Sequence, residues 1–424
     1  MPTTPRANLI ARAVISQFNK LPAKRKPTVR DNGLHEWVPL SGIVAEKDGD
    51  LTCLALATGM KCLPASKLAE ANGNAIHDWH AEVLAMRALN RFLLDECRAH
   101  AQHGRSGQVV DLSDLPGSKP FKIKDNVKLH MYCSEAPCGD ASMELVMAAQ
   151  DDSSPWHVPP LPPPREDAAH PSAAATLPGR AYFSQLGVVR RKPARGDAPP
   201  TLSKSCSDKI TLKQCTSLLS SLTSLLIDPS NAYINSLVLP DSQHSAAGCQ
   251  RAFSERMQSL VGKSWPGGYR FAPFTIETTG EEFVFSRAAV MSRAGRIAPS
   301  NLAAAWTCNG VEETILGGVL QGRKPFDEKG ASKMSRRRMW VAAGETVAYS
   351  NGRGDMIRHG LSGQTYQDVK DGELLADRRR VKQHVRQSAL AGWIPNQGDS
   401  KFSMALNSTS LKCKHPSRCN NAGR

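Results

Sequence analysis

The sequence lacks the features of a membrane or secreted protein. Its 424 residues contain no apolar run near the roughly 18–20 residues that a transmembrane helix needs. No secretory hydrophobic segment is present at the N-terminus. The 11 cysteines are scattered, unlike those of a small disulfide-stabilised scaffold. We therefore expect no membrane partner, and a reducing compartment in which some thiols are free to bind metal.

Acidic residues are absent from the first 30 positions, which carry seven lysines and arginines. Such a segment is typical of a basic surface arm or of a mitochondrial presequence; we favour the arm and expect a cytoplasmic or nuclear location. The whole chain has a formal net charge of +15. This charge favours a polyanionic partner over simple solubility, because each phosphate neutralised releases counterions. No feature indicates an obligate protein partner.

The chain shows no internal repeat but does show composition shifts. Residues 151–178 contain eight prolines and several alanines, as expected of a low-complexity surface insertion at about 151–180. We predict a basic arm over 1–35, one catalytic domain over 36–405 and a polar tail over 406–424. In the tail, Cys413 and Cys419 flank His415, but without a second ligand pair they are weak support for zinc.

The hydrophobic pattern predicts an α/β fold. Strands and helices alternate, and the leucines from 218 to 226 recur at helical spacing. We expect strands at 41–48, 51–58, 127–133 and 236–240, and helices at about 81–97, 139–149, 207–226 and near 366–391.

The first candidate site is "HDWHAEVLAM" at positions 77–86. Ala81, Leu84 and Ala85 begin an apolar stripe, so this helix should pack on a sheet. Positions two apart point about 200° apart on a helix. His80 and Glu82 can therefore converge only if His80 precedes the first helical turn. Alone this pair is weak, because a lone histidine beside a core helix usually has only a packing role.

The second candidate site is "APCGD" at 136–140, directly after a predicted strand. Pro137 and Gly139 indicate a tight turn that would place Cys138 at the next helix start, where a thiolate is favoured. His-x-Glu followed by Pro-Cys-x-x-Cys is typical of zinc nucleobase deaminases. Here the second cysteine is missing, since Ala141 occupies its place.

A catalytic zinc needs three protein ligands and an open position. His80 and Cys138 supply two, and the residues leave Cys133 and Cys206 open as the third. Cys206 stands before the predicted long helix, with Ser207 or Asp208 as capping residues. Such a zinc ion would lower the pKa of its bound water to about 7, and Glu82 would transfer the proton. The alternative is a closed structural zinc site, which would leave Glu82 without a role.

With these blocks in place, the sequence resembles the adenosine deaminases acting on RNA, most of all the tRNA-specific branch. The resemblance covers roughly 15–150 and 180–405 and favours Cys206 as the third ligand. Its motifs are "EWVPLSGIV" (36–44), "ATGMKCL" (57–63), "HDWHAEVLAMRALNRFL" (77–93), "APCGDASM" (136–143), "SKSCSDKI" (203–210) and "YQDVK" (366–370) with Trp393.

The resemblance implies a cytidine-deaminase-like mixed sheet carrying the zinc helices, with a C-terminal α+β region enclosing inositol hexakisphosphate. A sixfold phosphate requires many basic partners. The matching positions are Arg87, Lys209, Arg336, Tyr366, Lys370 and Trp393. The sequence departs from relatives at His77, Met86, Leu212 and Asn396, where they carry other residues.

For the substrate, the resemblance implies contacts from Lys61 and from the 190–197 loop, with Arg195 and Asp197 near its tip. It implies deamination of the adenosine immediately 3′ of the anticodon (position 37) in alanine tRNA. No double-stranded RNA-binding domain precedes the catalytic region, which favours a compact structured RNA. The alternatives are editing of duplex or messenger RNA, and a non-catalytic RNA-binding protein with a structural zinc.

Overall fold

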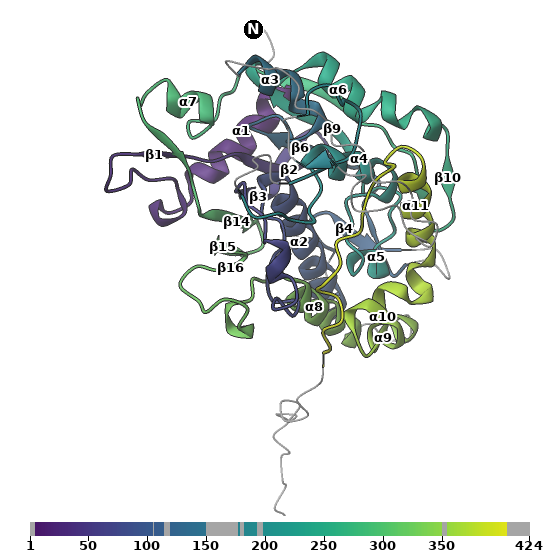
Figure 1. The fold of residues 1–424 in the computed structure, drawn as a ribbon. Coiled ribbons are helices and arrows are strands. Elements are labelled where there is room, and N and C mark those ends of the chain that lie inside the picture. The colour runs from purple at the N-terminus through teal and green to yellow at the C-terminus, as the bar shows by residue number, and fades with distance from the viewer. Residues whose placement is uncertain are drawn as a thin grey trace, which may run out of the picture.

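The protein is built on one central sheet. The structure, a computed structural model, describes residues 5–104, 106–113, 119–149, 177–178, 182–192, 198–349 and 354–404. The sheet has eight strands in the order β12-β9-β6-β2-β3-β14-β15-β16 (Figure 1). β6, β9 and β12 are parallel and the other neighbours antiparallel, so the mixed α/β prediction is confirmed. The strands are β2 (Leu40–Lys47), β3 (Asp50–Thr58), β6 (Val127–Cys133), β9 (Ile234–Pro240), β12 (Thr275–Thr279), β14 (Ala303–Thr307), β15 (Glu312–Leu316) and β16 (Val319–Leu320).

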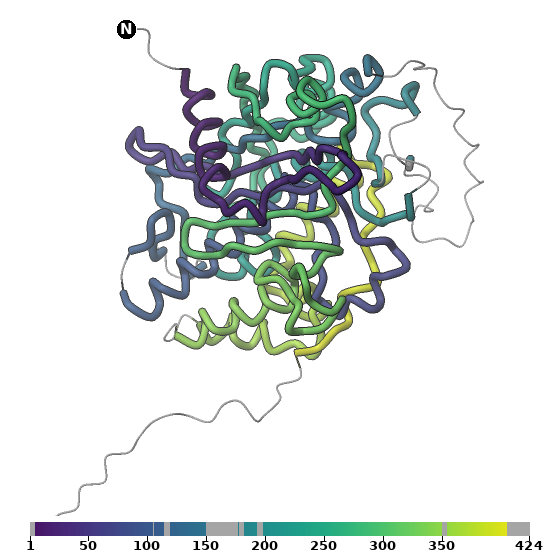
Figure 2. The backbone as a smooth tube through the Cα atoms, turned by 90° about the vertical axis from the view of Figure 1, so that its left-hand side faces the viewer, coloured from purple at the N-terminus to yellow at the C-terminus, as the bar shows by residue number. Residues whose placement is uncertain are grey.

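Helices cover both faces of this sheet. Along β2, Ile43 belongs to the large core that includes α2 (Ala81–His103), and Val44 belongs to a second core that includes α1 (Arg6–Asn19). This alternation follows from the two-residue period of a strand. Figure 2 shows α1 (purple) and the C-terminal segment (yellow) on different sides of the molecule. The other helices are α3 (Met143–Ala148), α4 (Cys206–Thr216), α5 (Thr223–Leu226), α6 (Ala246–Phe253), α7 (Arg287–Met291), α8 (Arg336–Ala348), α9 (Asp355–Leu361), α10 (Tyr366–Asp371) and α11 (Ala376–Gln387).

Local sequence sets the hairpin and the ends of α2. Asp48 and Gly49 both have positive φ, 53° and 91°, and form the two-residue connection between β2 and β3. Such turns suit the twist of a hairpin. α2 ends at Gly104, which is left-handed with φ 63°, as a helix-terminating glycine commonly is. The predicted strand pair, strand 127–133 and central helix are therefore confirmed.

Three predicted helices needed correction. The helix expected over 207–226 ends at Thr216, because Ser217 takes a φ of 57°, and a short α5 follows. Its leucines are buried in the core nonetheless. The helix expected over 139–149 is a 3-10 turn (Asp140–Ser142) followed by α3. The one expected near 366–391 is divided into α10, a 3-10 turn (Glu373–Leu375) and α11.

Within the described residues, four two-stranded sheets accompany the central sheet. Some of the predicted features fall on residues outside the described ranges. The small sheets pair β1 (His35–Trp37) with β13 (Ile297–Pro299), β4 (Val110–Leu112) with β5 (Phe121–Ile123), β7 (Leu177–Pro178) with β8 (Arg190–Arg191), and β10 (Ser264–Trp265) with β11 (Tyr269–Arg270). Among the described helices none has the length and apolar character needed to cross a bilayer. Arg195, Asp197, most of the proline-rich insertion and the tail cysteines lie outside the described residues.

Candidate active site

The candidate site forms around the start of α2. His80 is its N-cap residue, with an extended backbone (φ −62°, ψ 144°), so it precedes the helical turn as predicted. The loop from Gly59 to Cys62 binds this start, because the Ala81 amide donates to the Gly59 carbonyl at 2.8 Å. A Cβ at Gly59 would lie 2.2 Å from the Trp79 carbonyl oxygen. Only glycine allows this close approach.

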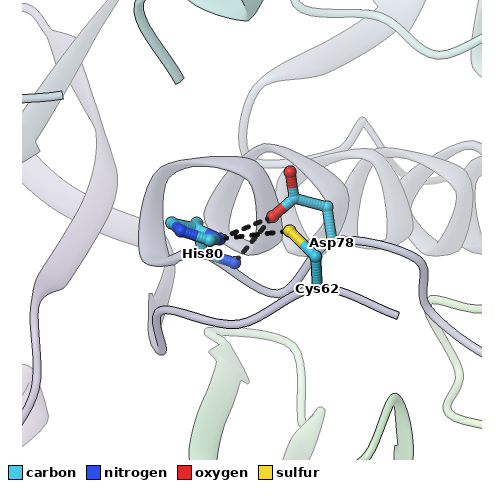
Figure 3. A group of neighbouring side chains, drawn as sticks. All are labelled: Cys62, Asp78 and His80. Carbon is cyan, nitrogen blue, oxygen red and sulfur yellow. Dashed lines mark hydrogen bonds and ion pairs between the residues drawn. The ribbon is translucent and has the colours of Figure 1, made fainter. Parts of the chain in front are cut away.

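His80 lies in a compact group with Cys62 and Asp78 (Figure 3). Its Nδ1 is 2.9 Å from Asp78 Oδ1 and 3.6 Å from the Cys62 sulfur. One ligand atom from each residue lies within 4.8 Å of the other two, which makes the group able to hold a metal ion. Burial and Lys192 lower the pKa of His80, but Asp78 and Cys62 outweigh them and raise it to about 10. The imidazole is thus paired with the Asp78 carboxylate.

The two predicted cysteine ligands contact each other although 68 residues separate them. The Cys206 amide is 3.4 Å from the Cys138 sulfur. A hydrogen bond from the Cys206 thiol holds the pKa of Cys138 well below its ordinary value, against the effect of burial and with help from Lys192 and His80. Burial and Cys138 raise the pKa of Cys206. The two pKa values are thus shifted in opposite directions, and Cys138 is the more acidic of the pair.

The helix starts near these cysteines differ in part from the prediction. Cys206 is the first residue of α4, as expected, but the N-cap is Ser205, whose hydroxyl accepts from the Asp208 amide at 3.0 Å. Ser207 and Asp208, the predicted caps, lie within the first turn. Cys138 precedes Gly139 and a 3-10 turn rather than an α-helix. A helix dipole therefore acts on Cys206 but does not account for the acidity of Cys138.

Glu82 lies in the first turn of α2 with only 6% of its surface exposed. Burial and the Cys138 thiolate raise the pKa of Glu82, while His80 and Lys192 oppose the rise. These influences place its carboxyl in the same electrostatic cluster as the imidazole and the thiolate. A buried carboxyl with a raised pKa is suited to accept and return a proton near neutral pH.

Lys192 is a site residue that the sequence did not reveal. Its Nζ lies 2.9 Å from Asp78 Oδ2 and 3.2 Å from the Cys206 sulfur, and its side chain is 5% exposed. Lys209 also binds Asp78 and donates to Ser203 Oγ at 2.6 Å. Asp78 therefore joins His80 to Lys192 and Lys209. Both Asp78 and Lys192 stand inside motifs noted in the sequence, but residue type alone did not distinguish them from surface charges.

The structure brings the predicted ligands into one region without bonding all of them together. Cys138 and Cys206 are in direct contact, and Lys192 connects them through Asp78 to His80. Among the described residues no hydrogen bond joins His80 to either sulfur. Cys133, the rejected alternative, is fully buried at the end of β6, and burial raises its pKa well above the ordinary value.

The predicted cofactor residues lie along a second, strongly basic region. Arg87 donates to the Met334 carbonyl at 3.0 Å, and Arg336 contacts His77 and Asp399. The Lys370 ammonium lies 5.8 Å from the centre of the Tyr366 ring. Trp393 has two cations near its ring, at 5.9 Å for Lys204 and 5.2 Å for Arg386.

Further cations complete this region and were missed in the sequence. We use the name basic cluster for Arg87, Lys204, Lys209, Lys213, Arg336, Lys370, Arg378, Lys382 and Arg386. Burial and the repulsion of neighbouring cations lower the pKa of several members, that of Lys204 to about 7 and that of Arg87 to about 10. Lys213 and Lys382 are lowered well below the ordinary value for the same reasons. The "RRRVKQHVR" segment of α11 was the available sign, since it supplies three members.

The four departures from related sequences have visible consequences. Leu212 packs in an apolar cluster. The ammonium of the adjacent Lys213 donates hydrogen bonds to the carbonyls of Leu218 and Leu219. Met86 is buried in the main core. His77 is 2.6 Å from Asp399, and burial and Arg336 lower its pKa to about 4. Asn396 Nδ2 lies 3.5 Å from His77.

The predicted substrate contacts are only partly placed. Lys61, in the loop before α2, binds the side chain of Asn301, and its carbonyl accepts from the Trp79 amide at 3.0 Å. It therefore lies beside the start of α2. The base of the 190–197 loop is fixed by a hydrogen bond of 2.8 Å from the Lys192 amide to the Ser203 carbonyl. Arg195 and Asp197, beyond this base, are not among the described residues.

A mixed sheet that carries an imidazole and a buried carboxyl at the start of one helix, beside two contacting cysteines, defines a deaminase-type enzyme. The chain belongs to the adenosine-deaminase (editase) domain family, whose sequence profile matches residues 55–397. The predicted resemblance is confirmed, and the protein is an enzyme that deaminates adenosine.

Three relatives illustrate the range of the similarity. The tRNA-specific adenosine deaminase 1 of Schizosaccharomyces pombe is 33% identical over 406 residues, covering 92% of this chain and 95% of that protein. The human protein of the same name is 25% identical, covering 90% and 96%. The double-stranded RNA-specific editase Adar of Drosophila melanogaster is 24% identical, covering 78% of this chain and 46% of that protein.

Proposed function

We propose that the protein converts adenosine to inosine in tRNA, at the adenosine immediately 3′ of the anticodon (position 37) of alanine tRNA. The reaction adds water at C6 of the base and releases ammonia, so it requires an activated water and a group that moves protons. The observation that carries the proposal is the position of Glu82, 6% exposed in the first turn of α2 and two residues after His80. The contacting Cys138 and Cys206 are joined to His80 through Lys192 and Asp78. The near full-length similarity to a tRNA-specific deaminase supports tRNA as the substrate.

His80, Cys138 and Cys206 are the residues that would hold zinc. Their donors suit the ion, since zinc takes thiolate sulfur and imidazole nitrogen. The Cys206 thiol lowers the pKa of Cys138, and the Cys138 sulfur contacts the Cys206 amide. The present contacts of the His80 ring with Asp78 and Cys62 are both made by Nδ1. When bound, the zinc would supply a water molecule of lowered pKa.

Glu82 would move the protons. Its carboxylate is placed to accept a proton as water attacks and to return it to the departing amine, so that one residue serves as base and then acid. Burial on the first turn of α2 fixes its position. Lys192 and Lys209 neutralise Asp78, and Lys192 also stabilises negative charge on Cys206. This arrangement supplies positive charge beside the metal ligands without occupying a ligand position.

The basic cluster is proposed to bind inositol hexakisphosphate. Buried cations are costly unless paired, and a cluster whose members lower one another's pKa has too few anions of its own. Arg378 Nε and Arg386 Nε have no hydrogen-bond partner among the described residues. A compact polyanion supplies the missing charge. Lys209 belongs to this cluster and also binds Asp78. A bound polyanion would therefore influence the active site through the Lys209–Asp78 ion pair.

The test is deamination of purified tRNA. Alanine tRNA transcript incubated with the protein should yield inosine at position 37, detected by mass spectrometry of the digested RNA. A transcript with guanosine at that position is the matched control and should remain unmodified. Inosine at any other position, or none at all, would contradict the proposed target.

Editing of duplex RNA is the second candidate, favoured by the similarity to a double-stranded RNA-specific editase. It predicts inosine in a long RNA duplex at rates comparable to those on tRNA. Competition between labelled tRNA and an unlabelled duplex in one reaction separates the two. We expect the tRNA to be the preferred substrate.

A further inference from the structure

Two chain segments must be held together to keep Cys138 and Cys206 in contact. One connection is local: the Ser207 hydroxyl donates to the Pro137 carbonyl at 2.9 Å and accepts from the Ala141 amide at 3.1 Å. Gly139 allows this approach, since a Cβ there would lie 2.4 Å from the Ser205 side chain. These contacts join the two segments on the side next to the sulfurs.

A second connection lies deeper and is ionic. Asp140 follows Cys138 by two residues, and Asp208 follows Cys206 by two residues. Arg256 lies between the two carboxylates. Its Nη2 donates to Asp208 Oδ1 at 2.8 Å, whereas its Nη1 is 4.0 Å from Asp140 Oδ2, an ionic contact without a hydrogen bond. The side chains of both aspartates are 0% exposed, and that of Arg256 is 5% exposed.

Neighbouring groups fix each carboxylate separately. Asp208 Oδ2 accepts from the Arg190 amide at 2.9 Å, and Asp140 Oδ1 accepts from the Gly187 amide at 2.9 Å. Arg251 donates to Asp140 at 3.2 Å and to Glu144 at 2.6 Å. Arg251 therefore acts on the Cys138 side, whereas Arg256 reaches both sides.

We propose that Arg256 is a positioning residue for metal binding, which bridges Asp140 and Asp208 and so holds Cys138 and Cys206 at ligand distance. The proposal rests on the zinc ligands given under the proposed function. An ion pair buried to this degree keeps its geometry because an unpaired carboxylate at that depth is strongly unfavourable. Removal of Arg256 leaves both aspartates without their shared cation and frees the two segments to separate.

The test compares Arg256→Met with Arg251→Met, which removes a more exposed arginine (16% against 5%) from the Cys138 side alone. Zinc affinity is measured by competition with a chromogenic chelator, and the cobalt-substituted proteins are examined for thiolate charge-transfer and ligand-field absorption. We expect Arg256→Met to bind zinc about 10–100-fold more weakly, as is typical when a residue supporting metal ligands is lost. Its cobalt spectrum should lose tetrahedral intensity. Arg251→Met should stay within about threefold of the unaltered protein, and Arg256→Lys should recover part of the affinity.

The outcomes separate this proposal from the function on which it rests. If the unaltered protein shows no cobalt–thiolate absorption, or if Cys206→Ala does not diminish its intensity, the zinc ligands themselves are wrong. If that absorption is present and Arg256→Met retains both the spectrum and the affinity, the positioning role is wrong and the function stands. Equal losses in Arg256→Met and Arg251→Met would also overturn the bridging role. Circular dichroism of each variant confirms that a loss does not reflect unfolding.

Discussion

The ammonium of Lys192 lies between a carboxylate and a thiol, 2.9 Å from Asp78 Oδ2 and 3.2 Å from the sulfur of Cys206. Burial lowers the pKa of Lys192, but Asp78 and three cysteines, Cys138, Cys206 and Cys62, raise it well above the ordinary value, so the side chain is charged. A fixed cation beside a thiol favours the thiolate that a metal requires. Lys192 therefore links the acid–base state of the site to a loop that precedes α4.

Replacement of Lys192 by methionine should impair catalysis more than substrate binding. The change leaves Asp78 with Lys209 but without Lys192. It also removes the ammonium that favours the thiolate form of Cys206. We expect kcat to fall about 10–100-fold, the usual effect of losing a group that supports a metal ligand, with KM for tRNA little changed. Steady-state kinetics with tRNA measure both constants. Lys67→Met, which removes a surface lysine paired with Glu70, is the control and should be unaffected.

Replacement of Glu82 by glutamine should abolish deamination without preventing tRNA binding. Glutamine keeps the size of the side chain but cannot accept the proton, so we expect kcat to fall by at least about 10²–10⁴-fold. Single-turnover assays measure the rate, and filter binding measures the Kd for tRNA. Glu70→Gln, on an exposed pair, provides the control. A Glu82→Gln protein with full activity would refute the assigned proton-transfer role.

Much of the fold could be predicted from local patterns in the amino-acid sequence. β6 and the β2–β3 pair appeared close to where the sequence placed them, because alternating side chains and an Asp-Gly turn leave few other solutions. The break at Ser217 was missed, because leucines at helical spacing also suit a buried turn. Tertiary contacts decide between the two, and local spacing does not record them.

The sequence identified those site residues whose chemistry follows from their residue type. It did not identify residues whose roles depend on contacts between distant parts of the chain. His80 at the end of a non-helical segment followed from geometry alone, and the structure agrees. The Asp78–Lys192 pair joins residues 114 apart in the chain, which no spacing rule identifies. The same holds for Arg256, which stands in no recognised motif.

Without a polyanion in the basic cluster, stability should depend on pH through Lys204. Burial and the nearby cations lower the pKa of Lys204 from 10.5 to about 7. Between these values the unfolded chain binds the proton that the folded protein has released, so the free energy of unfolding rises as pH increases from about 7 towards 10. Urea denaturation of protein stripped of inositol phosphate, at pH 7 and pH 9.5, should show this rise.

Two comparisons check that origin. Lys204→Met should reduce the slope, because methionine keeps the stem over Trp393 and removes the titrating group. Saturating inositol hexakisphosphate should also flatten the slope, since an adjacent polyanion favours the charged lysine. An unchanged slope in Lys204→Met would show that other members of the basic cluster dominate.

Glu135 should destabilise the folded protein above neutral pH. Burial raises the pKa of Glu135 from 4.5 to about 7, aided by Glu282 and Glu82 and opposed by Arg287, whose amide donates to the carboxylate at 2.8 Å. Here the folded protein binds the extra proton, so its stability falls as pH rises from about 4.5 to 7. Glutamine has no charge to desolvate and keeps an oxygen that accepts from the Arg287 amide. We expect Glu135→Gln to raise the free energy of unfolding by about 1–2 kcal/mol at pH 8 and by much less at pH 5. Urea denaturation at the two pH values measures the difference, and an equal gain at both would mean that packing rather than titration is responsible.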